Sequence, residues 1–405
     1  MTNGGRPTAG RSSAVAAVFF LNGAVLGNWA PRIPALRDAL SLDASTLGLA
    51  LAGTGTGGLI ATPLAAFGIR RYGSRAVVLV SATLLCAAFV LPALAHTWWA
   101  LALGLAVLGA ADAVLDVAMN AQGVIVEKRR GRSLMNRFHA AWSAGAVTGG
   151  LTGAAAAGVG LPVLTHFSIV GAVLLIVALI AVRSLVPDHV GATEAPRRQG
   201  ARLPRSAPLA LLGVLVLLAA LVEDVPQSWG AIYSTELGAG PGIAGLAVVA
   251  FSSAMFLGRL VGDALVDRFG RHRVLTGGAV LIAAAFVPAP IVTSPIVAAM
   301  LFAVAGFGSA PIFPAAFAMA GRLPGIAAGT ALTVVSLVAR IGVLAAPVTF
   351  GTVAQHTGFG WALWSMVVVG TAIAVLTLVL HRALAGTTGT RSPGTENQAG
   401  TRSSA

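Results

Sequence analysis

The sequence predicts an all-α integral membrane protein with twelve transmembrane helices in two pseudo-symmetric six-helix bundles. Of its 405 residues, 57% are hydrophobic and only 10% are charged, and the mean hydropathy is +0.87. Soluble domains carry roughly 25% charged residues, so this composition excludes a water-soluble globule. Apolar runs of about 20 residues recur along the whole chain, and each is long enough to cross the hydrocarbon core as a helix. The alternating pattern of a membrane β-barrel is absent from the sequence, and helices are the other structure that satisfies its own backbone in lipid.

Twelve apolar segments account for most of the chain. The first six are residues 14–36, 44–67, 76–95, 98–126, 137–160 and 163–183. The last six are residues 207–235, 242–264, 274–293, 295–320, 325–353 and 359–382. Asn22 and Asn28 interrupt the apolar core of the first segment, and further spans follow it directly. We therefore interpret that segment as a membrane span and not as a cleavable signal peptide.

A polar segment divides the spans six and six. Residues 184–206, SLVPDHVGATEAPRRQGARLPRS, are basic and rich in proline and glycine, which indicates a cytoplasmic linker. We therefore expect an N-terminal bundle at 1–183 and a C-terminal bundle at 207–384. The remaining residues 385–405 are rich in Gly, Ser and Thr, which predicts a disordered cytoplasmic tail.

The net charge of +13 raises the possibility of nucleic-acid binding, but the positions of the charges argue against it. With twelve spans and both termini on one side, all but three of the 26 Lys and Arg residues fall on that side. Arg32 and Arg37 lie opposite, and Arg340 lies within a span. This positive-inside distribution predicts a multi-pass protein of the inner (plasma) membrane with both termini in the cytoplasm. Lipid is thus the expected surroundings, and we expect a monomer with no nucleic-acid partner.

Catalytic and metal-binding patterns are absent from the sequence. Cys86 is the only cysteine, so neither an internal disulfide nor a cysteine-rich metal site can form. The seven histidines are scattered, without an HExxH motif or a nucleophile elbow. We therefore expect no enzyme activity, no metal and no cofactor. The glycine runs at 53–58, 145–153 and 342–351 are expected to let helices approach closely.

The two halves echo each other. LGLA at 47–50 and AGLA at 244–247 each open a second span, and RRYGSR at 70–75 and DRFGRH at 267–272 each close it. Both pairs are 197 residues apart. A six-plus-six duplication joined by a basic loop is the layout of transporters that rock two bundles around a midplane site.

These motifs resemble those of a known family. GRLVGDALVDRFGRHR at 258–273 is similar to the loop signature of the major facilitator superfamily. Within it, DVAMNAQGVIVE (116–127), FHAAWSAG (138–145), EDVPQSWGAIY (223–233) and GFGSAPIFPAAFA (306–318) resemble the fucose-permease-like branch. The resemblance implies two bundles and a gating loop. In that loop Asp263, Asp267, Arg268 and Arg271 would latch the bundles in the outward-facing state.

Acidic residues inside the fourth span are the main functional signal. Asp116 lies eleven residues before Glu127, so it is about 16 Å deep, near the midplane. Asp112, Asp116 and Asn120 are four residues apart and form one stripe on the helix. Burial favours the protonated acid, so we expect Asp116 and Asp112 to be proton carriers.

The family resemblance supports this role. Fucose permeases carry a glutamate followed four residues later by an asparagine on the matching helix, and that acid is linked to proton coupling. Asp116 and Asn120 match the pair. The aspartate of the family's first helix aligns with Trp29, so fucose itself is not the expected substrate; Asn28 beside it is expected to bind a hydroxyl.

Two further spans carry charged groups. Glu223 and Asp224 interrupt the seventh span, and Pro226, Gln227 and Trp229 follow. Proline is common where a discontinuous helix lines a cavity, so we expect Glu223 to take part in proton coupling and Asp224 to be its structural neighbour. Arg340 lies about 22 Å from Gly325 in the eleventh span and requires a carboxylate or an anionic substrate. Glu223 and Asp116 are its expected partners.

The remaining candidates define a polar cavity. His139 near the start of the fifth span is a candidate proton relay or a packing residue. Amide and aromatic side chains are expected to bind substrate: Asn22, Asn28, Asn120, Gln122, Gln227, Trp29 and Trp229.

These features predict a proton-coupled symporter for a small, sugar-like polar solute. The alternatives left open are a proton-antiport exporter of drugs or metabolites, a facilitator that binds no proton, and a sensor.

Overall fold

The computed structural model describes residues 6–131, 134–187, 206–323, 326 and 328–388. Most of the expected linker, and the expected tail from residue 389 onward, lie outside the described residues. Every regular element within these ranges is helical. The first group of helices is α1 (Arg6–Trp29), η1 (Ala30–Arg32), α2 (Ile33–Ala39), α3 (Ala44–Tyr72), α4 (Ser74–Ala88), η2 (Leu91–Leu94), α5 (Trp98–Arg130), α6 (Met135–Gly158) and α7 (Val163–Ser184).

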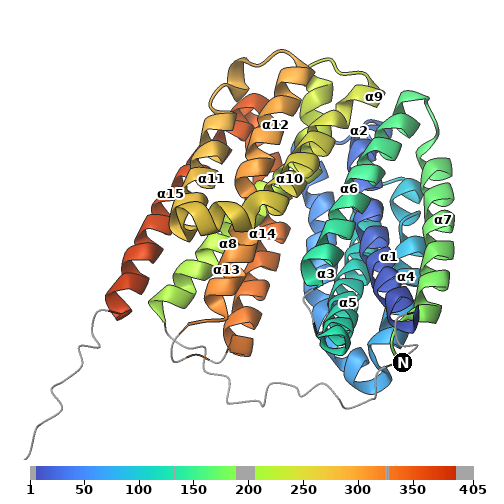
Figure 1. Cartoon of the computed structure of the whole chain (residues 1–405). Helices are drawn as coiled ribbons and strands as arrows, with labels where there is room; N and C mark the ends of the chain where they lie inside the picture. The colour runs from blue at the N-terminus through green and yellow to red at the C-terminus, as the bar shows by residue number, and fades with distance from the viewer. Residues whose placement is uncertain (1–5, 132–133, 188–205, 324–325, 327, 389–405) are drawn as a thin grey trace, which may run out of the picture.

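The second group follows the linker. It contains α8 (Ala207–Glu236), α9 (Pro241–Ala244), α10 (Leu246–Phe269), α11 (Arg271–Phe286), η3 (Ala289–Ile291), α12 (Pro295–Ser309), α13 (Ile312–Ala320), α14 (Ala328–Thr357) and α15 (Phe359–Thr388). Figure 1 shows the two groups side by side, with the blue-to-green helices on one side and the yellow-to-red helices on the other.

The expected spans correspond to helices, and one of these helices is less apolar than a typical membrane span. Among the described residues, eleven helical segments are long and apolar enough to cross a membrane. The segment expected at 137–160 forms α6, which has 24 residues but is not one of the eleven. Its sequence contains Arg137, His139 and many Gly and Ala residues, and few large apolar side chains. It nevertheless runs the full height of the first group (Figure 1).

Some of the expected spans are interrupted in the structure. α8 continues through Pro226 without interruption, in agreement with the single span expected at 207–235. The expected span 295–320 is instead divided into α12 and α13 at Ala310 and Pro311. The first span likewise ends at Trp29 and turns through η1 into α2.

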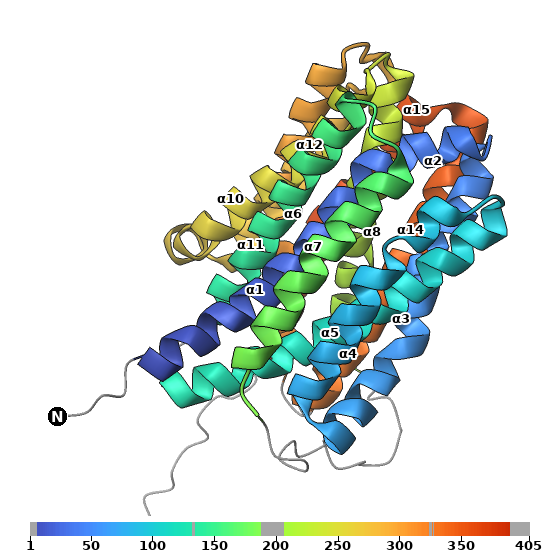
Figure 2. The same cartoon turned by 90° about the vertical axis from the view of Figure 1, so that its right-hand side faces the viewer.

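The two described ends of the chain lie at the same end of the molecule. α1 begins there at Arg6 and α15 ends there at Thr388, and we call this the termini end (Figure 1). Seen from the side in Figure 2, α7 lies along the first group beside α1 and α4, with which it makes its helix contacts.

At the opposite end the two groups are in direct contact, and we call this the closed end. Arg37 Nη1 of α2 lies 2.7 Å from Glu236 Oε1 of α8. The backbone N–H of Ala44 at the start of α3 donates to Gln355 Oε1 of α14 at 3.0 Å. Backbones also come close, because a Cβ built on Gly158 would lie 3.2 Å from Gly242 Cα.

Glycines make the closest helix pairs possible. At Gly23 and Gly145 a Cβ would overlap the backbone carbonyl oxygens of Trp142 and Phe20, so α1 and α6 pack with their backbones in contact. At Gly55 a Cβ would lie 2.8 Å from Leu344 Cα on α14. The expectation that the glycine runs form packing surfaces is therefore confirmed at these positions.

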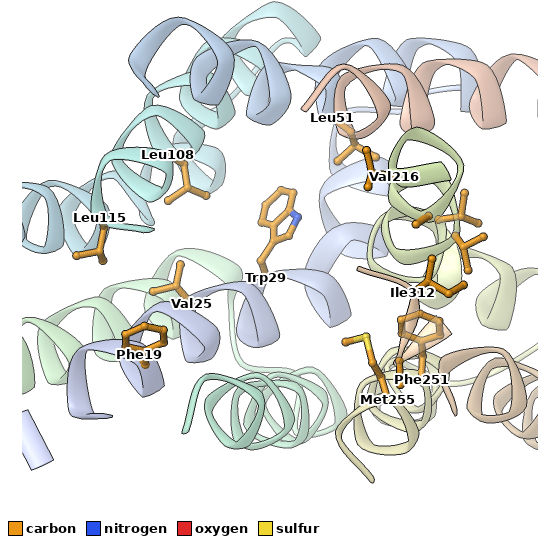
Figure 3. Packing of buried hydrophobic residues seen from close by; sticks show 14 of the residues in the cluster. Phe19, Val25, Trp29, Leu51, Leu108, Leu115, Val216, Phe251, Met255 and Ile312 are labelled. Atoms are coloured by element: carbon orange, nitrogen blue, oxygen red, sulfur yellow. The ribbon is translucent and has the colours of Figure 1, made fainter. Parts of the chain in front are cut away.

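The core is apolar and continuous across both groups. Buried residues of the two groups belong to one cluster, and Figure 3 shows members of it such as Trp29 of α1 and Phe251 of α10. Large apolar side chains are also exposed on the outer faces of the helices, among them Ile60, Leu103 and Ile296, each more than 60% exposed. Such a surface is unstable in water and suits the acyl chains of a lipid bilayer.

Candidate functional site

A cavity of about 880 Å³ lies between the two groups of helices. Its walls come from α5 and α6 of the first group and from α10, α13 and α14 of the second. Met135 at the start of α6 and Arg271 at the start of α11 belong to the lining, so the cavity extends toward the termini end. The polar and charged lining residues are Asp116, Asn120, His139, Ser143, Arg259, Arg271, Ser336 and Arg340.

The acidic stripe expected on the fourth span is present on α5. Asp116 and Asn120 line the cavity near the middle of this helix, whereas Asp112 lies one turn away, outside the lining. Asn120 Nδ2 donates to the backbone carbonyl oxygen of Asp116 at 2.8 Å and to its Oδ1 at 3.1 Å. The amide therefore holds the Asp116 carboxylate in place while the rest of the carboxylate faces the cavity.

Asp112 is held by a hydrogen-bonded chain across three helices. Asn22 Nδ2 of α1 donates to Asp112 Oδ1 at 2.6 Å, and Trp142 Nε1 of α6 donates to Asn22 Oδ1 at 2.7 Å. Because the indole N–H can only donate, the orientation of the Asn22 amide is determined. The sequence indicated a polar role for Asn22, but it did not indicate that Asn22 and Trp142 position an acid.

Arg340 reaches from the second group to the first. A Cβ built on Gly58 of α3 would lie 3.3 Å from Arg340 Nη1, so the missing side chain leaves room for the guanidinium. The charge of Arg340 acts on the carboxyl groups of both Asp112 and Asp116. Of the two partners expected for this arginine, the structure therefore brings it to the acids of α5 and not to Glu223.

Glu223 has a different partner, which the sequence reasoning missed. Its Oε1 lies 3.5 Å from Arg259 Nη2, and both side chains are about a quarter exposed. Arg259 lies on α10 and lines the cavity, whereas Glu223 on α8 stands behind it. The positive-inside distribution predicts Arg259 at the cytoplasmic face, whereas the structure places it in the wall of the cavity. The signal that could have found it was the same as for Arg340, a lone charge inside an apolar run.

Asp224 also has a local partner. Ser228 Oγ, one turn further along α8, donates to Asp224 Oδ2 at 3.0 Å. This contact is consistent with the structural role expected of Asp224.

Several residues expected to bind substrate lie outside the cavity lining. Gln122 is fully buried, and its Nε2 donates to Ser74 Oγ at 2.7 Å and to the Val186 carbonyl oxygen at 2.9 Å. Its Oε1 accepts the Val186 N–H at 3.1 Å. The side chain therefore ties α5 to α4 and to the segment after α7. Gln122 comes two residues after Asn120, which turns it about 200° around the helix, away from the cavity.

Asn28 is likewise part of a buried network in the first group. Its Nδ2 donates to the Ala24 carbonyl oxygen at 2.8 Å, and Thr152 Oγ1 donates to its Oδ1 at 3.0 Å. His166 Nε2 lies 3.0 Å from the same oxygen. These contacts occupy the amide, so the structure does not place it where a substrate in the cavity could reach it.

The two tryptophans are packing residues in this structure. Trp29 is 9% exposed and its ring lies 6.1 Å from that of Phe167. Trp229 is fully buried, with ring centroids 5.4 Å from Phe350 and 5.9 Å from Phe359. Both residues come near the closed end of their helices, away from the cavity lining.

Gln227 is also absent from the lining. Its Nε2 lies 3.4 Å from Ser252 Oγ on α10, a long hydrogen bond between α8 and α10.

The residues expected to gate the protein lie at the termini end of α10 and α11. Asp267 and Arg268 are exposed, and the Arg268 guanidinium lies 5.4 Å from the centroid of the Phe269 ring. Arg271 is half-buried and lines the cavity. The Asp263 side chain lies outside the part of the chain that the structure describes.

A bundle of membrane-spanning helices around a central charged cavity defines a polytopic transporter. The Major Facilitator Superfamily model matches residues 15–223 and 212–403. The chain belongs to this superfamily and is a multi-pass membrane transporter that carries a small-molecule substrate. Members of the superfamily are transporters and not enzymes, so the cavity is a candidate binding site and not an active site.

Proteins of similar sequence are named as membrane transporters or membrane proteins. An uncharacterized MFS-type transporter of Yersinia pestis is 33% identical over 346 residues, which cover 83% of this chain and 87% of that protein. The membrane protein MosC of Rhizobium meliloti is 29% identical, over 92% of this chain and 91% of MosC.

Solved structures share the fold at low sequence identity. A mutant of the nucleoside transporter NupG has a TM-score of 0.76 and 12% identity, and the match covers 91% of this chain and 99% of that one. A D-xylose-proton symporter has a TM-score of 0.73 and 17% identity, over 92% and 97%. These matches support the fold alone, and the resemblance to the fucose-permease-like branch stays a prediction.

Proposed function

We propose that the protein is a proton-coupled symporter that moves a small polar organic solute through the cavity by alternating access. The observation that carries this proposal is the placement of Asp116 and Asn120 on one wall of the cavity and Arg259 and Arg340 on the other. The walls belong to different groups of helices, so movement of one group against the other changes access to the site. The cavity meets the termini end and the opposite end is closed, which corresponds to an inward-facing state if the termini are cytoplasmic.

Protonation supplies the coupling in this scheme. With Asp112 and Asp116 ionised, their attraction for Arg340 draws α5 of the first group toward α14 of the second. Protonation of one acid weakens that attraction and releases the guanidinium. Because proton and substrate then act on the same two-state equilibrium, each changes the affinity of the other. Asp112 and Asp116 are the proposed proton-binding groups, and Glu223 with Arg259 forms a second ionic contact beside the site.

We assign the remaining features as follows. Residues 1–183 and 207–384 act as the two moving bundles, residues 184–206 join them in the cytoplasm, and the protein works as a monomer in the inner membrane. Asp267, Arg268 and Arg271 take part in gating at the cytoplasmic surface. His139 lines the cavity and is the proposed relay between Asp116 and the cytoplasm.

The test uses purified full-length protein in proteoliposomes. A thermal-shift screen of sugars, sugar acids and other small metabolites at two pH values identifies a transported solute. Accumulation driven by an imposed pH gradient is then measured for the wild type and for Asp116→Asn. We expect the variant to lose gradient-driven accumulation but to keep exchange of solute across the membrane, because it binds substrate without a titrating proton.

The matched control is Asp38→Asn, which removes an exposed carboxylate on α2 and should leave transport unchanged. Full gradient-driven accumulation by Asp116→Asn would refute proton coupling through this acid. Accumulation of solute inside the vesicles only when the interior is more acidic than the outside, so that protons leave as solute enters, would instead indicate an antiport exporter.

A further inference from the structure

The cavity carries more guanidinium groups than a neutral solute requires. Arg259, Arg271 and Arg340 all line it, and among the described side chains Asp116 is the only carboxylate in the lining. Arginine remains charged at any physiological pH and presents five N–H donors in a planar arrangement. A sugar without a charged group can accept hydrogen bonds from such a site, but it cannot balance its charge.

Two of these arginines have donors that the described residues do not satisfy. Arg259 Nη2 makes a long contact of 3.5 Å with Glu223, and Arg259 Nε is buried without a hydrogen-bond partner among the described residues. Within the same part of the chain, the structure gives Arg340 neither a hydrogen bond nor an ion pair within 4.0 Å, although the group is half-buried. A buried donor without an acceptor is costly, which applies to Arg259 Nε, and the Arg340 guanidinium faces the cavity without an acceptor from the described residues. Both groups can therefore receive an acceptor from a ligand.

The charge balance identifies the valence of that ligand. Counting the described side chains of the lining and the acids in contact with its charges, three arginines oppose three carboxylates, those of Asp112, Asp116 and Glu223. The site is therefore neutral when all three acids are ionised. The proton required by the proposed function leaves one positive charge uncompensated, and one monoanion would restore neutrality.

The remaining lining describes the rest of the ligand. Asn120, Ser143 and Ser336 offer donors and acceptors that suit hydroxyl groups, and Phe256 and Phe313 offer flat apolar surfaces. The volume of about 880 Å³ lies within the range of small-molecule sites. A planar carboxylate matches the geometry of guanidinium N–H groups and forms paired hydrogen bonds with them.

We propose that the substrate is a hydroxylated organic monocarboxylate of the sugar-acid class, with its carboxylate bound by Arg340 and Arg259. This inference rests on the proposed function, because it takes the cavity as the substrate site. Its consequence is electroneutral transport, in which one proton and one monoanion move together.

Other titratable groups surround this site and must be considered with it. From each neighbouring helix, the groups that face or adjoin the cavity are Asp112 and Asp116 on α5, His139 on α6, Glu223 and Asp224 on α8, Arg259 on α10, Arg271 on α11 and Arg340 on α14. Asp224 is absent from the lining and, among the described residues, interacts with none of the three arginines, so it is left out of the charge count.

The experiment compares probes that differ only in charge. Radiolabelled D-glucuronate and D-glucose, and D-galacturonate and D-galactose, each exchange a carboxylate for a CH₂OH group, and D-gluconate adds an open-chain acid. Binding and uptake are measured with full-length protein in proteoliposomes. We expect at least one of the acids to bind about ten-fold or more tightly than its neutral partner, since charge-assisted hydrogen bonds are the strong ones.

Variants assign the carboxylate to its arginines. Arg340→Gln and Arg259→Gln are expected to abolish the preference for the acid, whereas Arg340→Lys should retain part of it because it keeps the charge. Arg183→Gln removes the same charge at an exposed position on α7 and should have no effect. Thermal stability of each purified variant shows whether it is folded, and Arg340→Lys keeps the comparison meaningful if a Gln variant does not fold.

The membrane potential separates this inference from the proposed function. Electroneutral uptake should respond to an imposed pH gradient and not to a valinomycin-induced potassium potential. Gradient-driven uptake of a neutral sugar in preference to its acid would overturn the carboxylate inference and leave the proton symporter intact. Uptake of the acid that ignores the pH gradient would refute the coupling and leave the carboxylate site intact. Failure of all five probes to bind or move would overturn the sugar-acid assignment.

Discussion

Asn22 shows how a single buried amide can position a functional acid. Its oxygen accepts the Trp142 indole N–H and its nitrogen donates to Asp112, so it connects α6, α1 and α5 through two short hydrogen bonds. Asn22 is only 2% exposed. A side chain of similar size without polar atoms would leave both the indole N–H and the carboxyl oxygen without these partners.

We therefore predict that Asn22→Leu destabilises the protein and impairs proton-driven uptake. Loss of partners for buried polar groups costs about 1–3 kcal/mol, which should appear as a lower midpoint of thermal unfolding in detergent. Asn22→Asp keeps the acceptor for Trp142, so it should be more stable than Asn22→Leu. It also places a second acid beside Asp112, so proton-driven uptake should still be impaired. A Leu variant with wild-type stability and wild-type gradient-driven uptake would show that the chain of hydrogen bonds has no functional part.

Sequence reasoning at this scale was strongest where one helix carries the whole pattern. The spacing of Asp112, Asp116 and Asn120 predicted a shared face, and the structure places them on one stripe of α5. Pairing between helices was harder, because it depends on how each helix is rotated in the bundle. Arg340 was therefore given Glu223 as a possible partner, and the arginine that lies beside Glu223, Arg259, was missed.

At the scale of elements, the start of α3 combines a helix cap with a contact between the two groups. The backbone N–H of Thr46 donates to Asp43 Oδ1 at 2.7 Å, and this hydrogen bond lowers the pKa of the Asp43 carboxyl. Ala44, the residue directly after Asp43, donates its N–H to Gln355 of α14. The cap thus holds the turn from which the first group contacts the second.

We predict that Asp43→Ala lowers the stability of the closed end. Loss of an N-cap costs about 0.5–2 kcal/mol, whereas Asp43→Asn keeps a capping oxygen and should cost less. Because the folded-state pKa is lowered, the charged cap stabilises the fold above the unfolded-state pKa, and this contribution is lost as pH falls through the folded-state pKa. The stability difference between wild type and Asp43→Asn should therefore shrink in acid.

Thermal unfolding of the three proteins across an acidic pH series checks this prediction. Asp38→Ala provides the control, because Asp38 is an exposed carboxylate on the neighbouring α2. Equal stability of Asp43→Ala and wild type at neutral pH would contradict a role for the cap.

The sequence predicted the helices better than their interruptions. Apolar length alone located the membrane spans, since a helix must satisfy its own backbone in lipid. α8 continues through Pro226, as the single span expected at 207–235 requires, whereas the span expected at 295–320 is divided at Ala310 and Pro311. A proline residue removes one backbone hydrogen bond of the helix, and the packing of neighbouring helices decides whether the helix stops there.

At the scale of the whole molecule, the function depends on contacts that must form in one state and separate in the other. The ion pair of Arg37 and Glu236 joins the two groups at the closed end, and the Arg37 guanidinium also lies 5.7 Å from the centroid of the Phe359 ring. The side chains are 22% and 44% exposed, so the pair is worth only about 0.2–1 kcal/mol. A contact of this size can bias a conformational equilibrium without locking it.

We predict that reversing one charge of this pair shifts the protein toward the state that is open at the closed end. Val348 of α14 is a suitable reporter, because its Cα would lie 3.4 Å from a Cβ on Gly48 of α3. A membrane-impermeant maleimide should label Val348→Cys a few-fold faster in Arg37→Glu than in wild type, as expected for a change of about 1 kcal/mol. The one native cysteine, Cys86, is buried and can be replaced by serine as background.

The double charge reversal, Arg37→Glu with Glu236→Arg, provides the matched control. It exchanges the two charges without changing the net charge, so it should return labelling to the wild-type rate if the ion pair itself holds the groups together. Faster labelling in the single variant that persists in the double variant would assign the effect to loss of the Arg37–Phe359 contact instead. Identical labelling in all three backgrounds would mean that apolar contacts such as Gly48 with Pro347 close this end, and the ion pair would then have no part in alternating access.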